Sequence, residues 1–152
     1  MSTPFPALDD VVRCFAATPR PTKFVDASHC SECAEHNATL SAHTPGSITL
    51  EELGNPGWDP ICFVQDINAF RYYLPAMARL ACGQGEAYYL AQFLFHLNQA
   101  RIDALLPGER SVLATFLTGL MEAFPADIDS AGDTDTLLCT IAALRDNQGS
   151  AT

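Results

Sequence analysis

Apolar residues recur along this chain at the three- and four-residue spacing of α-helices, and the strict alternation of a half-buried strand is scarcely present. The first run starts at Pro6 and contains Ala7, Leu8, Val11, Val12, Phe15 and Ala16. A helix is expected here, and it should end before the Pro-Arg-Pro of residues 19–21, because proline cannot continue a helix. The hydrophobic pattern alone therefore favours a helical protein.

Later runs predict further helices, each with a residue suited to start it. Asp26 or Ser28 is expected to cap a helix that carries residues 29–40, and Asp66 to cap one that runs toward Cys82. Pro75 lies inside the latter helix and should kink or divide it. The remaining expected helices are a short turn after Thr49, Glu86–His96, Pro107–Met121, and one near Leu137–Leu144 after Asp133 or Thr134.

Residues 53–60 read Leu-Gly-Asn-Pro-Gly-Trp-Asp-Pro and form the clearest loop in the chain, because two glycines and two prolines leave little room for a helix or a strand. We therefore predict an all-α fold, a single compact domain of five to seven helices over residues 1–152. Flexible ends are expected at 1–5 and 147–152. A chain of 152 residues is long enough to bury a core without disulfides.

The net charge of the chain limits the classes of molecule that it is expected to bind. A formal net charge of −10 argues against nucleic acid and against an anionic membrane, since both need clustered Lys and Arg. No Lys or Arg occurs from Val25 through Phe70, although this stretch carries seven acidic residues. A cation or a basic protein partner would be attracted to it.

The N-terminus lacks the pattern of a secretory signal, and no apolar run approaches the ~18 residues of a membrane span. We therefore expect a cytoplasmic protein, whose thiols stay reduced. Four cysteines are scattered singly among apolar neighbours and are expected to act as small core residues: Cys14, Cys62, Cys82 and Cys139.

The segment from His29 to His36, His-Cys-Ser-Glu-Cys-Ala-Glu-His, concentrates the reactive side chains of the chain. If it is helical, ~100° per residue places its two histidines and Cys33 within about 60° of one another, with Cys30 at the edge of that face. Thiolate and imidazole are the ligands of tetrahedral Zn²⁺. We therefore predict a zinc site with Cys30, Cys33 and His36.

One helix cannot easily supply four ligands, so at least one is expected from outside this set. His29 is expected on the same helical face as these residues. One ligand is expected from another segment, with Cys62 and Asp59 as the best candidates and His43 as another. Such a site is expected to be structural rather than catalytic, tying the N-terminal part of the chain to the rest.

The same residues also permit redox chemistry. A Cys-x2-Cys pair near a helix N-terminus is the dithiol arrangement of oxidoreductases, with His36 as a proton relay. It is similar to the helical alkylhydroperoxidase family, whose motif is Cys-x2-Cys-x3-His with an upstream Glu. Here the His follows one residue earlier and no Glu precedes Cys30. The resemblance implies a dithiol oxidoreductase that uses Cys30, Cys33 and His36, and a metal-assisted hydrolase is a further enzyme alternative.

Three blocks of the chain resemble a small bacterial family of uncharacterised proteins. They are His29 to His36, Leu53 to Pro60, and the Tyr-Tyr-Leu-Pro of residues 72–75. The resemblance implies no activity and suggests only that the blocks belong to one structural unit.

Taken together, these observations favour a small acidic zinc-binding protein that acts through protein–protein interaction rather than catalysis. Small acidic helical proteins of bacteria include neutralising partners of toxins and effectors, and that role is expected by analogy alone. Trp58 is expected to fold back on the core, with a partner anchor as the alternative. His96 is expected to be a core or boundary residue with its hydrogen bonds satisfied.

Overall fold

The computed structural model describes residues 6–146, and every regular element in that range is helical. The α-helices are α1 (Pro6–Phe15), α2 (Ser31–Ser41), α3 (Leu50–Leu53), α4 (Ile67–Ala81), α5 (Leu90–His96), α6 (Gln99–Ala104), α7 (Pro107–Ala123), α8 (Pro125–Ser130) and α9 (Thr134–Asp146). Three 3₁₀ turns are η1 (Pro56–Trp58), η2 (Pro60–Phe63) and η3 (Gly85–Ala87). The all-α prediction is confirmed, whereas five to seven helices is too few for the nine in this range. The expected flexible ends, 1–5 and 147–152, lie outside the described residues.

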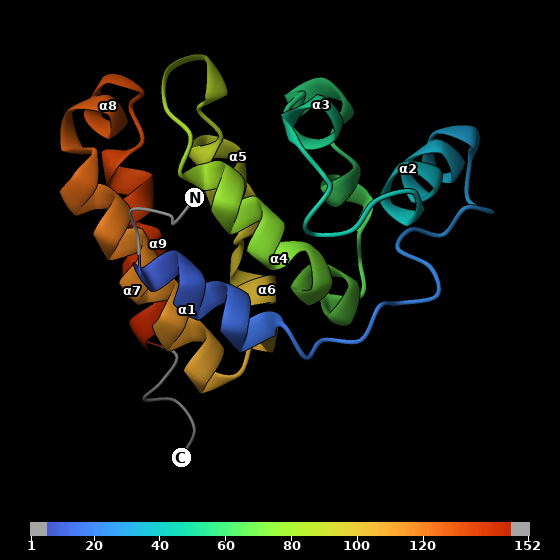
Figure 1. Cartoon of the computed structure of the whole chain (residues 1–152), viewed down its shortest axis with the longest axis horizontal. Coiled ribbons are helices and arrows are strands. Elements are labelled where there is room, and N and C mark those ends of the chain that lie inside the picture. The colour runs from blue at the N-terminus through green and yellow to red at the C-terminus, as the bar shows by residue number, and fades with distance from the viewer. Residues whose placement is uncertain (1–5, 147–152) are drawn as a thin grey trace.

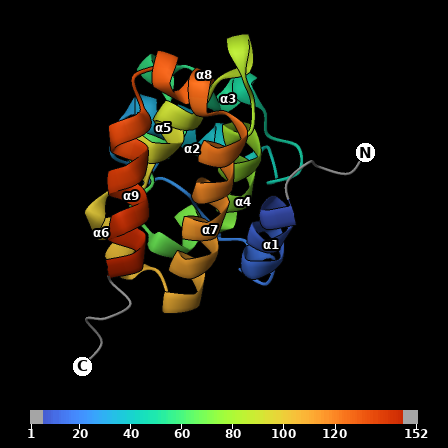
Figure 2. The same ribbon diagram turned by 90° about the vertical axis from the view of Figure 1, so that its left-hand side faces the viewer.

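The helices form a bundle with a smaller lobe at one side. Helix α7 packs against α9 and α1, and α1 also packs against α4. Helices α2 and α3 lie on the opposite side of α4 from α7, α8 and α9 (Figure 1). The view turned by 90° places α7 and α9 in front and α2 and α3 behind them (Figure 2). Helix α4 therefore lies between the main bundle and the part of the chain that carries the Cys/His segment.

Helix α4 supplies much of the core because its apolar residues occupy most of its surface. Its buried side chains include Phe70, Tyr73, Leu74 and Met77, as the helical spacing predicts. Asp66 accepts a hydrogen bond from Asn68 N at 2.8 Å, which confirms it as the cap. Pro75 is contained within α4, and the helix continues as one element beyond it. Of the two outcomes expected at Pro75, a kink or a division, the division is therefore wrong.

Two short helices account for part of the difference in helix number. Asn98 caps α6 by accepting a hydrogen bond from Arg101 N, and Pro125 starts α8. Each of these helices has one buried residue, so neither shows an apolar stripe in the sequence. The helix expected over Glu86–His96 is also shorter, because η3 occupies 85–87 and α5 begins only at Leu90.

The Gly/Pro-rich loop of 53–60 is more ordered than predicted. Asn55 accepts a hydrogen bond from Gly57 N, and Asp59 accepts one from Ile61 N. These two side chains start η1 and η2, and a proline takes the first position of each turn. The loop is a pair of capped 3₁₀ turns, of which η2 packs against α2.

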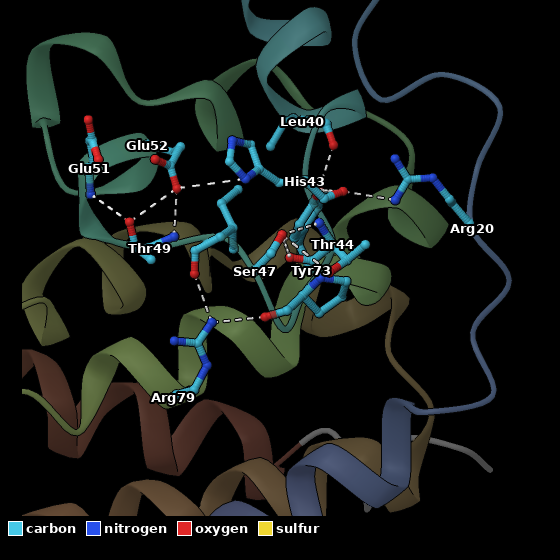
Figure 3. A network of polar contacts seen from close by, with 12 residues as sticks. Arg20, Leu40, His43, Thr44, Ser47, Thr49, Glu51, Glu52, Tyr73 and Arg79 are labelled. Carbon is cyan, nitrogen blue, oxygen red and sulfur yellow. Dashed lines mark hydrogen bonds and ion pairs between the residues drawn. The ribbon is translucent and has the colours of Figure 1, made fainter.

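Helix α2 is fastened to the body near its C-terminal end. The Tyr73 hydroxyl lies 2.5 Å from the carbonyl oxygen of Leu40 and 2.8 Å from that of His43 (Figure 3). Arg20, in the long link between α1 and α2, donates to the carbonyl oxygens of Ser41 and His43. These contacts position α2 so that its N-terminus faces η2. No helix in the described range combines the length and apolar character needed to cross a membrane.

Candidate metal and thiol site

The reactive segment enters α2 at Cys30. This residue is the N-cap, with extended backbone angles, and its Sγ accepts a hydrogen bond from Cys33 N at 3.3 Å. Asp26 and Ser28, the expected caps, instead form a turn of their own before the helix. His29 consequently lies outside α2, so its predicted placement on the helical face is wrong.

Three donor atoms of the segment lie together at this N-terminus. The sulfurs of Cys30 and Cys33 are 3.2 Å apart, and His29 Nδ1 lies 3.5 Å from Cys33 Sγ. All three ligand atoms lie within 4.8 Å of one another. With Zn–S bonds of ~2.3 Å and Zn–N bonds of ~2.0–2.1 Å, tetrahedral corners are about 3.5 Å apart for N and S and about 3.8 Å for two sulfurs. The 3.5 Å between His29 Nδ1 and Cys33 Sγ already fits a tetrahedral zinc site. The two sulfurs, at 3.2 Å, must move slightly apart to bind the ion.

The surroundings favour the thiolate form of Cys30. Its pKa is lowered from 9.0 to about 7, first by the Cys33 N–H, then by the Cys33 thiol and the His29 ring. Hydrogen bonding to Cys30 also raises the pKa of His29. Cys30 is exposed whereas Cys33 is buried. An exposed thiolate at a helix N-terminus suits both metal ligation and nucleophilic attack.

The second cysteine has the opposite tendency. Hydrogen bonding to Cys30 and desolvation raise the pKa of Cys33, and the charges of Glu32 and Asp26 raise it further. The negative charges of Glu32 and Asp26 are therefore felt at the group formed by His29, Cys30 and Cys33. Their negative charge disfavours a second thiolate in the metal-free protein, and it attracts a cation.

His36 lies one turn after Cys33 and is not part of this group of donor atoms. Its ring is fully buried between Trp58 and Phe63, with 4.6 Å between ring centroids on each side. Neither ring nitrogen makes a hydrogen bond within the described chain, although Nε2 lies 3.5 Å from Glu32 Oε1. A buried polar atom without a partner costs roughly 1–3 kcal/mol. The unpaired ring nitrogens of His36 therefore reduce the stability of the folded protein.

Trp58 packs against the ring of His36, a contact that the sequence did not predict. Its indole covers His36, yet 42% of the residue remains exposed. The expected packing of Trp58 onto the body of the protein is thus observed in part, and its role as an anchor for a partner stays a prediction.

Cys62 lies in a second group of candidate ligands, with Asp59 and His96. Asp59 Oδ2 lies 2.7 Å from His96 Nε2 and accepts a further hydrogen bond from Gln92 at 2.9 Å. His96 and Asp59 are both buried. The expectation that His96 is a buried residue with its hydrogen bonds satisfied is confirmed.

Arg101 contacts His96 in this second group, and this contact affects which ring nitrogen can bind a metal. Its Nη1 lies 3.5 Å from His96 Nδ1 and 3.1 Å from the His96 carbonyl oxygen. Because a guanidinium only donates, Nδ1 is the acceptor in this contact, which leaves Nε2 to donate to Asp59. A protonated Nε2 and a nearby cation both oppose metal binding. Asp59, His96 and Arg101 form a network of polar contacts, and the pKa of Cys62 beside it is raised by burial and by Asp59.

A pocket of about 460 Å³ has residues of both groups on its wall. His29 and Cys33 lie on its wall together with Cys62. The remaining lining includes Phe24, Val25 and Phe63, with Lys23 as its cation. The pocket brings Cys62 to the same hollow as the first group, but the closely spaced donor atoms remain those of His29, Cys30 and Cys33.

The structure thus brings three of the five predicted ligands together and leaves His36 and Cys62 apart from them. His43, an alternative ligand, lies 4.0 Å from Glu52 and is remote from this group. Sequence reasoning missed the Asp59–His96–Arg101 network, for which no local pattern exists, because its members come from the N-cap of η2, from α5 and from α6. The function of the site rests on this geometry, since no family model, no curated protein and no solved structure matches the chain.

Proposed function

We propose that this protein binds one zinc ion through His29, Cys30 and Cys33, and that the ion orders an acidic surface for a basic protein partner. The observation that carries the proposal is the set of three donor atoms within 4.8 Å at the N-terminus of α2. Two thiolates and a neutral imidazole balance the charge of Zn²⁺, and their soft donors suit zinc among the common divalent ions.

The hydrogen bonds from distant parts of the chain reach α2 in its middle and at its C-terminal end. Tyr73 and Arg20 hold the C-terminal end of α2, and Asn37 accepts hydrogen bonds from Phe24 N and Val25 N in its middle. An ion at the N-terminus would fasten the turn at Asp26 to the first turn of the helix. Metal binding would then stabilise the fold locally, as in other structural zinc sites.

Elemental analysis tests the metal. The protein is purified without a histidine tag and under reducing conditions, and zinc is measured together with the reactivity of its thiols before and after chelation. We expect one zinc per chain, with Cys30 and Cys33 protected from alkylation until the chelator is added. Cys139→Ser, at an exposed cysteine on α9, is the matched control and keeps full zinc content. Metal-free protein from zinc-supplemented cells would refute the proposal.

The proposed basic partner is tested by changing the salt concentration and by removing acidic side chains of this chain. Residues 25–70 carry seven carboxylates and no Lys or Arg, and exposed Trp58 lies in the same stretch. We expect a basic protein to be retained by the immobilised wild-type chain at low salt and released as salt rises. The triple variant Glu32→Gln, Glu35→Gln, Trp58→Ala should fail to retain it. A protein that binds the immobilised wild-type chain and the immobilised triple variant equally, at all salt concentrations, would contradict a basic docking partner.

A dithiol oxidoreductase is the second candidate, favoured by the difference between exposed Cys30 and buried Cys33 at a separation of 3.2 Å. The Cys30 thiolate would attack a substrate disulfide and form a mixed disulfide. Cys33, losing its proton, would then displace the second substrate sulfur, so the substrate leaves as a dithiol and a Cys30–Cys33 disulfide remains. Rapid reduction of one equivalent of a small disulfide by the reduced, metal-free protein, lost in Cys30→Ser, would support this function over zinc binding.

A further inference from the structure

We propose that zinc binding recruits His36 as the fourth ligand, through Nδ1, and withdraws its ring from between Trp58 and Phe63. The inference rests on the proposed zinc site and adds its regulation: the ion both closes the site and changes the surface around Trp58. A closed site with four protein ligands is structural, whereas an open fourth position would admit a catalytic water.

The position of His36 on α2 makes this recruitment possible. His36 and Cys33 are three residues apart and both lie on the buried face of the helix. Side chains at this spacing are neighbours, and Cα–Cβ bonds point toward the helix N-terminus. The imidazole therefore reaches back toward Cys33 by rotation of its own side chain, with α2 unchanged.

Glu32 selects the nitrogen that binds. Its Oε1 lies 3.5 Å from His36 Nε2, one turn earlier on the same helix. Histidines that bind metals almost always donate their other ring N–H to a carboxylate, a carbonyl or water. Glu32 is in place to accept from Nε2 and leaves Nδ1 for the ion. Glu32 is thus a positioning residue, acting through His36.

The unpaired nitrogens of His36 supply the reason for the movement. This fully buried imidazole makes no hydrogen bond through either nitrogen. Coordination gives one nitrogen the ion and lets the other close on Glu32, so both polar atoms gain partners. The cost is the loss of the two ring contacts with Trp58 and Phe63.

Other candidates for the fourth position are worse placed. Asp26 already accepts two hydrogen bonds from Ser28. Cys62 lies across the pocket and belongs with Asp59 and His96. His36 alone among the predicted ligands is buried without a hydrogen bond.

The movement has a built-in probe, because Trp58 is the only tryptophan in the chain. Its ring centroid lies 4.6 Å from that of His36, so removal of the imidazole changes the surroundings of the indole directly. We expect tryptophan emission to change on zinc addition and to saturate at one equivalent. Trp58 is also exposed, so the same step reshapes the surface offered to a partner.

The experiment titrates reduced, metal-free full-length protein with Zn²⁺ and follows stoichiometry, affinity and Trp58 emission together. Co²⁺ is used in parallel, because its visible absorption reports the donor set. His36→Phe keeps an aromatic ring between Trp58 and Phe63 but cannot bind a metal. We expect its zinc affinity to fall at least about a hundredfold and its Co²⁺ spectrum to shift, while Glu32→Gln loses about tenfold, as partners of metal-bound histidines do. Cys62→Ser, which removes the rival ligand, should bind as the wild type does.

The outcomes separate this inference from the zinc site itself. One zinc bound by the wild type without a change in Trp58 emission, or bound by His36→Phe within about threefold of wild-type affinity, would overturn the role of His36 and leave the three-ligand site standing. No zinc bound by the wild type would overturn both. If His36→Phe does not fold, His36→Gln and the emission of the wild-type protein decide the matter.

Discussion

Asp59 Oδ2 lies 2.7 Å from Nε2 of His96, and this contact joins η2 to the end of α5 inside the protein. Both side chains are at least 97% buried. The two carboxylate oxygens of Asp59 also accept from Ile61 N and from Gln92. One aspartate therefore satisfies three donors, two from α5 and one from η2, and holds the start of η2 against α5.

Replacement of Asp59 is expected to be costly. Asp59→Ala leaves the His96 and Gln92 side chains and the Ile61 N–H without their acceptor in a buried place, which should reduce the free energy of unfolding by about 3 kcal/mol or more. Asp66→Ala removes an exposed helix cap and should cost only about 1 kcal/mol. Urea denaturation of both variants measures the difference. Equal losses would show that the buried network contributes no more than an ordinary cap.

Arg101 should not be replaceable by lysine. Its guanidinium donates to the carbonyl oxygens of Ile61, Val64 and His96, and it lies 4.4 Å from the ring centroid of Phe70. Lysine keeps the charge but cannot reach three acceptors from one planar group. We expect Arg101→Lys to lower the free energy of unfolding by about 2 kcal/mol. The matched change Arg13→Lys, at the surface, should leave it within about 0.5 kcal/mol of the wild type.

The hydroxyl of Tyr73 should matter more than that of its neighbour. Tyr73→Phe leaves the carbonyl oxygens of Leu40 and His43 without this donor at the end of α2 (Figure 3). We expect a loss of about 1–2 kcal/mol in unfolding free energy. Tyr72→Phe removes only an acceptor for Arg20, at the surface, and should cost less than about 0.5 kcal/mol. Hydrogen exchange of α2 amides would show whether the loss is local, and equal effects of both variants would contradict this assignment.

The pKa values of the cysteines predict a pH profile for metal-free protein. The pKa of Cys30 is lowered from 9.0 to about 7, so its thiolate is more abundant near neutrality than that of an ordinary cysteine. Alkylation of Cys30 by iodoacetamide should therefore rise with pH around a midpoint of about 7. Cys33, whose pKa is raised, should react later and more slowly. Mass spectrometry of the labelled peptides resolves the two.

The His29 ring contributes to this profile by hydrogen bonding to Cys30. His29→Ala should move the midpoint upward, toward that of an ordinary thiol, and lower the rate of alkylation at neutral pH. A midpoint that stays near 9 in the wild-type protein would show that the helix N-terminus does not stabilise this thiolate.

Zinc should stabilise the folded protein by mass action. At free zinc of 100 times its dissociation constant the expected gain is about 2.7 kcal/mol, and a chelator should remove it. Cys33→Ser should abolish the gain, while Cys139→Ser should retain it. Thermal unfolding with and without zinc measures the effect. An equal rise in melting temperature for Cys33→Ser would place the metal elsewhere in the protein.

The main helices could be predicted because their signals are local. Asp66 starts α4, Thr49 starts α3 with Glu52 closing the capping box, and Pro107 lies in the first turn of α7. Helices α6 and α8 were missed because a helix of six residues with one buried side chain has too few apolar positions to show a period. The capping residue of α2 was wrong because Cys30 takes a place where Ser, Thr, Asp or Asn is usual.

The candidate site could be predicted only in part. The clustering of His29, Cys30 and Cys33 follows from their closeness in the sequence, and the structure brings them together. The separation of His36 from them depends on Trp58 and Phe63, which come from η1 and η2 and pack on its ring. Periodicity within one helix does not show which distant ring will cover a residue.

By itself, the sequence determined the helical character, most helix starts and the position of the thiol and imidazole donors, because these depend on neighbours within about one or two turns. Only the tertiary structure decided that Asp59 pairs with His96, and that His36 is buried without a hydrogen bond. Both outcomes depend on residues far apart in the chain, whose separation is set by packing of the whole core.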